Sequence, residues 1–141
     1  MTGLAFCSLQ NEEGTFNFMP WVWSTGAGSY EINSEGGVKA LTLAKDLVES
    51  GAMSKECINW TQGDVMNQFI SGNVAMMING PWQIPTMKEE APDLNWNVAL
   101  IPKDSDYASV LGGENYAVIA GGNEEGALSF LQYATEETQV K

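Results

Sequence analysis

The sequence contains no histidine and few positive charges. Without histidine, the commonest general base and the usual zinc ligand are missing, and so is every Ser-His or Cys-His nucleophilic pair. Six Lys plus Arg against eighteen Asp plus Glu give a formal net charge of -12. This charge disfavours nucleic acid as a partner, because affinity for nucleic acid depends on neutralising phosphates. It disfavours an anionic membrane surface in the same way, and it suits a neutral or cationic ligand.

Several other signals are also missing. No apolar run approaches the ~20 residues that span a bilayer, and no basic segment followed by an apolar one opens the chain as a signal peptide would. Cys7 and Cys57 lie far apart and form no CxxC or zinc spacing, so we expect two buried thiols, with a single disulfide as the alternative. No nucleophile elbow or phosphate-binding P-loop is found. We therefore expect no catalytic residues, no metal and no cofactor.

The composition is that of one ordinary globular domain. The chain has 141 residues, of which 44% are hydrophobic and 17% charged. Segments with strand patterns alternate with segments of helical periodicity, so the expected fold class is α/β, with a mixed sheet flanked by helices. The expected elements are a strand in residues 3–10, a helix over 35–50 with Val38, Leu41, Ala44, Leu47 and Val48 inward, a helix over 64–71, a strand over 74–78 covered on both faces, a short helix over 81–90, strands over 95–102 and 116–120, and a last helix after Asn123.

The region between the first strand and the first of these helices, residues 11–37, has little periodicity. It is rich in Gly, Asn, Ser and aromatic residues, which predicts a long loop, and loops of that length are usually functional or partly helical. Trp21 and Trp23 lie two residues apart within it, so in extended backbone both rings would face the same way. They are candidates to line an aromatic wall, and the alternative is that they pin the loop to the core.

Trp82 stands in the segment "VAMMINGPW", directly after a buried strand and an Asn-Gly-Pro turn. In open α/β sheets, ligands bind beyond the carboxyl ends of the strands, and Trp82 would lie there. A helix that begins at Pro81 also offers free backbone N–H groups. An indole ring with nearby donors suits a sugar, which has an apolar C–H face and an edge of hydroxyls.

A second candidate element is the loop Gly112-Gly113-Glu114-Asn115. Paired glycines permit close approach of the backbone to a ligand, and a carboxylate with an amide can bind neighbouring hydroxyls. The alternative is a glycine-rich turn with a solvated carboxylate. The adjacent acidic pairs elsewhere are interpreted as solvated charge and helix-dipole complements; they are Glu12 with Glu13, Glu124 with Glu125, and Glu136 with Glu137.

Taken in order, these pieces resemble the extracellular solute-binding proteins of carbohydrate ABC importers. The resemblance is carried by "WTQGDVMNQFISGNVAMMINGPWQIP", "WNVALIPK", "LGGENYAVIAG" and "EEGALSFLQYATEE". It covers nearly the whole chain, and the ordered set is specific although each piece alone is weak.

The resemblance implies a lobe of the type II periplasmic-binding-protein fold, in a two-lobed protein that closes on a sugar and delivers it to a membrane permease. Residues 1–122 would form the ligand-binding second lobe, and residues 123–141 a helix that returns to the first lobe. Because family members are far longer, the chain is expected to be a truncated second lobe. The ligand-binding residues implied are Trp82, Trp23, Trp21, Glu114, Asn115 and Gly113.

The partners implied are a mono- or oligosaccharide and the permease subunits, at an extracellular or periplasmic location that allows a lipid anchor in the full-length protein. The full-length protein is expected to be a monomer. The last helix would expose an apolar face in the shorter chain, which predicts self-association.

Two other readings stay open. A polyamine or peptide ligand is compatible with the acidic charge. A glycoside hydrolase would need two carboxylates flanking the scissile bond, and Glu31 and Glu114 are the loop carboxylates near aromatic stretches.

Overall fold

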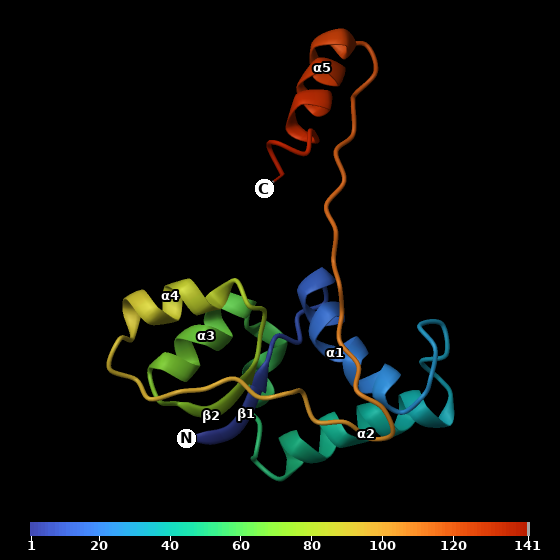
Figure 1. Cartoon of the computed structure of the whole chain (residues 1–141). Coiled ribbons are helices and arrows are strands. Elements are labelled where there is room, and N and C mark those ends of the chain that lie inside the picture. The colour runs from blue at the N-terminus through green and yellow to red at the C-terminus, as the bar shows by residue number, and fades with distance from the viewer. Residues whose placement is uncertain (141) are drawn as a thin grey trace. The chain divides into compact units, whose positions relative to one another are not determined.

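The computed structural model describes residues 1–140 and divides the chain into two compact units, Met1–Val110 and Leu111–Lys141. The first unit contains all of the strands and most of the helices (Figure 1). Its elements in chain order are β1 (Thr2–Phe6), α1 (Glu12–Ser24), α2 (Glu35–Glu49), the 3-10 helix η1 (Lys55–Asn59), α3 (Gln62–Ile70), β2 (Val74–Ile78) and α4 (Gln83–Glu90). The second unit contains α5 (Glu124–Ala134).

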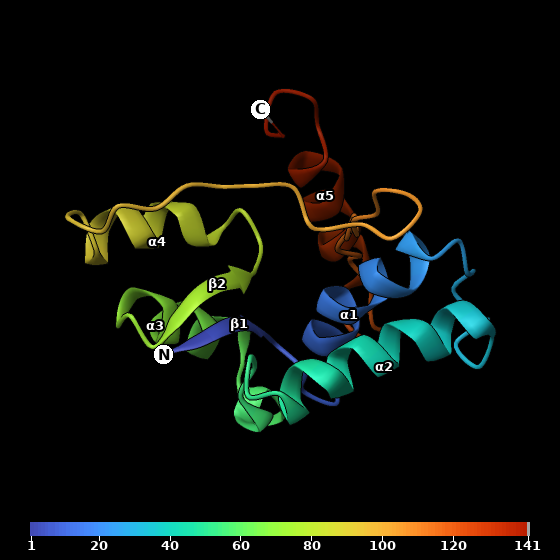
Figure 2. The ribbon, with the colours of Figure 1, turned by 90° about the horizontal axis from the view of Figure 1, so that it is seen from below.

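The sheet of the first unit consists of β1 and β2, which pair in parallel. Thr2 lies opposite Val74 and Phe6 opposite Ile78, and an isolated bridge joins Leu4 to Met53. The mixed sheet expected from the sequence is therefore not formed within residues 1–140. Helices α1 and α2 lie on one side of the two strands, and α3 and α4 on the other (Figure 2).

The core lies where β1 meets the helices. Phe6 and Val22 are fully buried there, and the ring of Trp21 lies 5.0 Å from that of Phe6. Burial of this apolar surface is the main stabilising contribution for so small a sheet. The remaining buried members of this core are Ala5, Cys7, Met19, Ala40, Met53, Cys57, Val65 and Val74.

The helices begin and end where local chemistry predicts. The Ser34 side chain accepts the Gly37 N–H at the start of α2, and Thr61 and Asp64 form a capping box at the start of α3. α3 gives way to Gly72, whose φ of 71° is the left-handed conformation that glycine adopts at low cost. Both predicted helices and their stops are confirmed to within two residues.

The segment 11–37 is partly helical, one of the two possibilities expected for it, because residues 12–24 form α1. Asn11 caps this helix by accepting the Gly14 N–H at 3.2 Å. Pro20 lies inside it and removes one backbone donor. The buried face of α1, with Met19 and Val22, compensates for this poor helical sequence.

Two other predictions are corrected. Residues 95–102 and 116–120 form no strands, since no neighbouring strand supplies their backbone hydrogen bonds in the described part of the chain. β2 is not covered on both faces, because Ala75 and Met76, whose side chains point to opposite faces, are both exposed. On α2, Ala44, Leu47 and Val48 pack against the core as expected, but Val38 and Leu41 face solvent.

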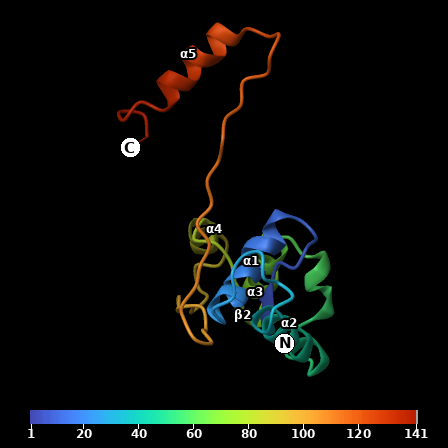
Figure 3. The same cartoon turned by 90° about the vertical axis from the view of Figure 1, so that its right-hand side faces the viewer.

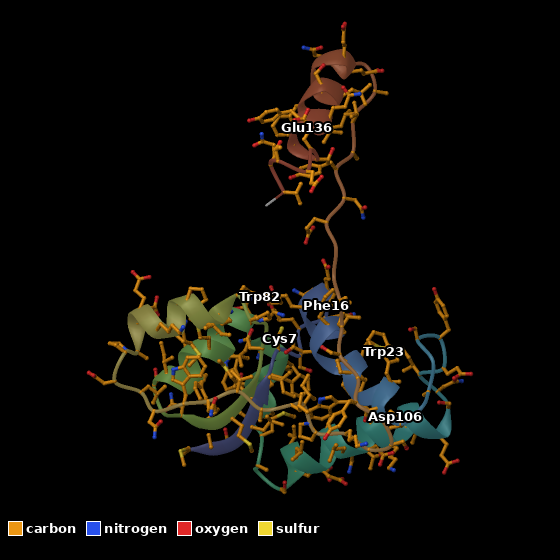
Figure 4. The ribbon with its side chains drawn as sticks, viewed as in Figure 1. Cys7, Phe16, Trp23, Trp82, Asp106 and Glu136 are labelled. Carbon is orange, nitrogen blue, oxygen red and sulfur yellow. The ribbon has the colours of Figure 1, made fainter. Side chains whose placement is uncertain are left out.

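Residues 104–106 are tied to the end of α1. The Asp104 N–H donates to the Ser24 hydroxyl at 3.0 Å, and the N–H groups of Ser105 and Asp106 donate to the Ser24 carbonyl. The Lys39 ammonium of α2 pairs with the Asp104 carboxylate at 2.6 Å. This segment is therefore anchored to α1 and α2 without forming regular structure; Figure 4 labels Asp106 in it.

The second unit is one helix with an extended entry. α5 is capped by the Asn123 side chain, which accepts the Gly126 N–H at 3.0 Å, and the segment before it runs as an extended trace (Figure 3). None of the helix's residues is buried, and Leu128, Phe130 and Tyr133 are more than half exposed.

Candidate binding edge of the sheet

Because β1 and β2 are parallel, their carboxyl ends meet at one edge of the sheet. Cys7 follows β1 at this edge, and Asn79 follows β2. The chain continues from β1 into α1 and from β2 into α4, so both helices start from this edge. Figure 4 labels Cys7 at the end of β1, Phe16 on α1 and Trp82 at the start of α4. We refer to this region as the carboxyl edge.

A chain of hydrogen bonds fixes the carboxyl edge. The Glu13 carboxylate on α1 accepts the backbone N–H of Gln62 at 2.8 Å, at the first residue of α3. The Gln62 carbonyl accepts the Asn79 side-chain amide at 2.8 Å, and the Asn79 side-chain oxygen accepts the Gly80 N–H at 2.9 Å. These hydrogen bonds connect helices α1 and α3 to the end of β2 just before the chain reaches Trp82.

Trp82 is presented to solvent at this edge. Its side chain is 56% exposed, and it stands at the N-cap position of α4 without a side-chain capping bond. The six-membered part of its indole lies over Gly80, so closely that a Cβ on Gly80 would collide with the ring. Within residues 1–140, no acceptor takes the backbone N–H of Trp82. The edge therefore offers a ligand the exposed indole ring of Trp82 and, beside it, the backbone N–H of the same residue as a hydrogen-bond donor.

Trp21 and Trp23 do not line one wall together. Both belong to α1, not to extended backbone, so their side chains diverge around the helix axis. Trp21 is 8% exposed and packs between Phe6 and Phe18 in the core. Trp23 is half-buried, and its indole N–H donates to the Ser29 hydroxyl at 3.1 Å. Trp23 keeps an accessible ring surface, whereas Trp21 is a core residue.

Gly113, Glu114 and Asn115 belong to the second unit. They lie in a segment without helix or strand, and all three are exposed. A Cβ on Gly113 would meet nothing within 4 Å.

The electrostatics of the carboxyl edge do not favour covalent chemistry. Burial raises the pKa of the Cys7 thiol, and the neighbouring Glu13 carboxylate, 3.6 Å from its sulfur, raises it further. Burial likewise raises the pKa of the Cys57 thiol. Both thiols are free and buried, as expected, and a thiol with a raised pKa is a weak nucleophile. The described residues contain no group of three or more His, Cys, Asp or Glu side chains that could hold a metal ion.

Sequence reasoning missed the residues that position Trp82. Glu13 was interpreted as solvated charge, but its carboxylate is partly buried and accepts two hydrogen bonds. Gln62 and Asn79 were not singled out. The available signal was the position of Asn79 directly after a strand, where a polar side chain at the carboxyl end faces the ligand side of a parallel sheet.

A small parallel sheet with helices on both sides and an exposed tryptophan at its carboxyl edge defines a lobe of an α/β ligand-binding protein. The sequence matches, over residues 3–141, the profile of the family described as bacterial extracellular solute-binding protein. The chain belongs to this family. The family and the fold are those of binding proteins and not of enzymes, so the glycoside hydrolase interpretation of Glu31 and Glu114 is wrong.

Individual relatives support the assignment. The chain is 32% identical over 121 residues to the maltodextrin-binding protein MdxE of Bacillus subtilis (strain 168), which covers 82% of this chain and 28% of that protein. It is 33% identical over 87 residues to a protein of Brucella abortus (strain 2308) named as a binding protein, covering 57% of this chain and 21% of that protein.

A solved structure extends the match to nearly the whole chain. The structure resembles an ABC transporter solute-binding protein from Thermotoga lettingae TMO bound with alpha-D-tagatose, with a TM-score of 0.79 and 28% identity. The match covers 99% of this chain and 38% of that chain, which confirms the expected solute-binding-protein fold. The chain thus spans well under half the length of each relative. Within the described residues, no helix has the length and apolar character to cross a membrane.

Proposed function

We propose that this chain forms a carbohydrate-binding lobe of a solute-binding protein that serves an ABC importer. The sugar lies with its apolar face on Trp82 at the carboxyl edge, and it is passed unchanged to the membrane permease. The protein works outside the cytoplasmic membrane, in keeping with the extracellular family to which the chain belongs. Tagatose in one structural relative and maltodextrin in the name of a sequence relative support a sugar as the ligand class.

The observation that carries this proposal is that the Trp82 ring is exposed and held in one position. A large apolar side chain costs free energy when it is left in water, and Trp82 is nevertheless 56% exposed. It is held above Gly80 at the end of a hydrogen-bonded chain of four residues, which fixes the backbone on which the ring stands. A ring that is already fixed in position loses little conformational entropy when a ligand stacks on it.

The other candidate residues take secondary parts in this proposal. Trp23 would contact the ligand with the accessible part of its ring, and Trp21 would support it from the core. Gly113, Glu114 and Asn115 would supply close backbone approach and hydrogen bonds to hydroxyls from the second unit. Residues 1–122 would act as the ligand-binding lobe of the full-length protein, with residues 123–141 returning to the other lobe.

A polyamine or peptide ligand is the competing proposal, and the net charge of -12 favours it. The Glu13 carboxylate at the carboxyl edge is engaged by Gln62 and Cys7, so it is not free to bind a polycation. A polyamine would need free carboxylates to replace its hydration. The exposed indole ring of Trp82 favours the sugar, whose apolar face can stack on it.

A thermal-shift and calorimetric screen of the chain tests the proposal with maltodextrins, tagatose, spermidine and a mixed peptide pool. We expect stabilisation by a sugar, and an affinity loss of at least about tenfold in Trp82→Ala, since a stacked ring and its buried area are removed. Tyr30→Ala, which removes a fully exposed aromatic ring elsewhere, is the matched control and should bind as the parent does. A response to spermidine or peptide alone would overturn the sugar assignment.

A further inference from the structure

The Glu13 carboxylate joins three elements of the first unit. Glu13 lies in the first turn of α1, and its Oε2 atom accepts the backbone N–H of Gln62, the first residue of α3, at 2.8 Å. The same oxygen accepts the thiol of Cys7, directly after β1, at a sulfur–oxygen distance of 3.6 Å. One side chain of α1 therefore binds both the start of α3 and the end of β1.

The start of α3 needs this acceptor. The first N–H groups of an α-helix have no partner within the helix. In the capping box of α3, the Thr61 hydroxyl accepts the Asp64 N–H at 3.0 Å, and the Asp64 carboxylate accepts the Thr61 N–H at 2.9 Å. The Gln62 N–H lies outside this box and is bound by Glu13. The N-terminal turns of α1 and α3 both favour a negative charge, so a carboxylate is well suited to this place.

Gln62 connects the start of α3 to the end of β2. Its carbonyl accepts the Asn79 side-chain amide at 2.8 Å, and the Asn79 Oδ1 atom accepts the Gly80 N–H at 2.9 Å. The Asn79 Nδ2 atom also lies 3.8 Å from the sulfur of Met77. Both ends of the Asn79 amide are thus engaged, which fixes the backbone at the glycine over which the Trp82 ring lies.

The Trp82 ring depends on this backbone because few other contacts hold it. Trp82 is 56% exposed and is not among the residues packed against the core. Among the described residues, the aromatic pairs in contact all involve Trp21, and the indole N–H of Trp82 has no acceptor. Pro81 has a fixed φ, so the position of the ring follows the backbone at residues 79 and 80.

We propose that Glu13 is a positioning residue for the sugar site. Removal of its carboxylate frees the start of α3, the Asn79 amide loses its fixed acceptor, and the Trp82 ring leaves the position in which a sugar stacks. Glu13 acts through these residues and does not touch the ligand. The expected effect on sugar affinity rests on the proposed function, whereas the expected effect on the ring is independent of any ligand.

Nuclear magnetic resonance of the unliganded chain tests the effect on the ring. The five tryptophans give five indole N–H resonances, and Trp82→Phe identifies that of Trp82. We expect Glu13→Ala to shift or broaden this resonance, while that of the buried Trp21 shows that the fold is kept. Glu13→Gln retains an oxygen acceptor for the Gln62 N–H and should restore the parent resonance.

The matched control is Glu12→Ala, which removes the neighbouring carboxylate in the same turn of α1. Glu12 is exposed, and its side chain forms no hydrogen bond or ion pair within residues 1–140. The Trp82 resonance should therefore stay in place in this variant. Asn79→Ala breaks the same connection without removing the acceptor at α3, so it should move the resonance even where Glu13→Ala fails to fold.

Calorimetric titration with the sugar that stabilises the parent chain tests the effect on affinity. Glu13→Ala should weaken binding at least about fivefold and Glu13→Gln by less than about twofold, because a displaced ring no longer stacks on the ligand. Since Glu13 acts through Asn79, a chain with both positions changed to alanine should lose no more than the weaker-binding single variant, to within about twofold.

Three results would overturn the proposal. These are a Trp82 resonance that Glu13→Ala leaves unchanged in a folded chain, a Glu13→Gln variant that moves it as far as Glu13→Ala does, and losses of affinity that add in full. If no sugar binds the parent chain but the resonance moves as expected, the sugar assignment fails and the positioning role of Glu13 is supported.

Discussion

Replacement of Gly80 by alanine separates the positioning of Trp82 from the stability of the lobe. A Cβ at residue 80 would occupy the space of the Trp82 six-membered ring, so the ring must leave its place. Gly80 is not among the glycines with positive φ, so alanine fits its backbone without strain. The perturbation therefore acts on the ring alone.

The magnitude follows from the exposure of Trp82. A ring that is 56% exposed can swing toward solvent, so we expect the free energy of unfolding to change by less than about 1 kcal/mol. A ring locked in a packed core would instead cost about 1–3 kcal/mol on overpacking. Sugar affinity should fall at least about tenfold, close to the loss in Trp82→Ala, because the plate is no longer where the ligand lies.

Two assays measure these effects separately. Urea denaturation gives the unfolding free energy, and calorimetric titration gives the affinity for the sugar that stabilises the parent chain. Near-UV circular dichroism reports the ring displacement without any ligand. Gly122→Ala is the control, since a Cβ there meets only the Ile119 carbonyl at 3.7 Å. If Gly80→Ala binds sugar with the affinity of the parent chain, the sugar does not stack on the Trp82 ring.

Three further predictions concern stability. Met87→Ala should lower the unfolding free energy by about 2–5 kcal/mol in urea denaturation, because Met87 is 1% exposed, while Met76→Ala at the exposed face of β2 should change it by less than about 1 kcal/mol. Asp64→Asn should make the free energy of unfolding depend less on pH in acid. Hydrogen bonds from the Thr61 hydroxyl and N–H lower the pKa of Asp64 in the folded state. The contribution of Asp64 to stability is therefore present above its unfolded-state pKa and is lost as pH falls through its folded-state pKa. The Cys7 and Cys57 thiols should affect stability at alkaline pH, because burial raises the pKa of both. Their contribution to the free energy of unfolding is full below the ordinary thiol pKa and is lost as pH rises through the folded-state pKa values. A variant with alanine at both cysteines should lack this pH dependence.

Each of these has a contradicting outcome. Equal losses in the two methionine variants would mean that Met87 is not more deeply buried than Met76 in solution. An acid unfolding midpoint that Asp64→Asn leaves unchanged would mean that the capping box does not form in solution. A pH slope in the alkaline range that persists without the thiols would assign it to other titrating groups.

Local patterns were sufficient for elements that carry their own signals. α2 and α3 were predicted because each combines an N-cap, an amphipathic period and a terminal glycine, all of which act over one or two turns. The bounds of α1 could not be predicted, because Pro20 and several weak helix formers oppose a helix there. Its helical state depends on contacts of Met19, Trp21 and Val22 with distant parts of the chain.

The prediction of strands over 95–102 and 116–120 was wrong because it, too, depended on contacts with distant parts of the chain. Alternating hydrophobicity predicts that a segment can form a strand, but a strand also needs a neighbour with free backbone groups. Val98 and Ile119 remain exposed in the described chain, so their segments have neither that neighbour nor a covering face. The hydrophobic pattern of one segment does not show whether a neighbouring strand is available to pair with it.

The sequence alone determined the class of protein, because an ordered set of short motifs and an acidic, histidine-free composition exclude most other functions. It also placed Trp82 after a strand, since strand, turn and helix start are all local. Only the tertiary structure decided which tryptophan is available to a ligand: Trp21 is buried against Phe6, whereas Trp82 is held over Gly80 by a chain that starts at Glu13. Exposure depends on which distant side chains pack around a ring, and those contacts form only when the strands and helices come together.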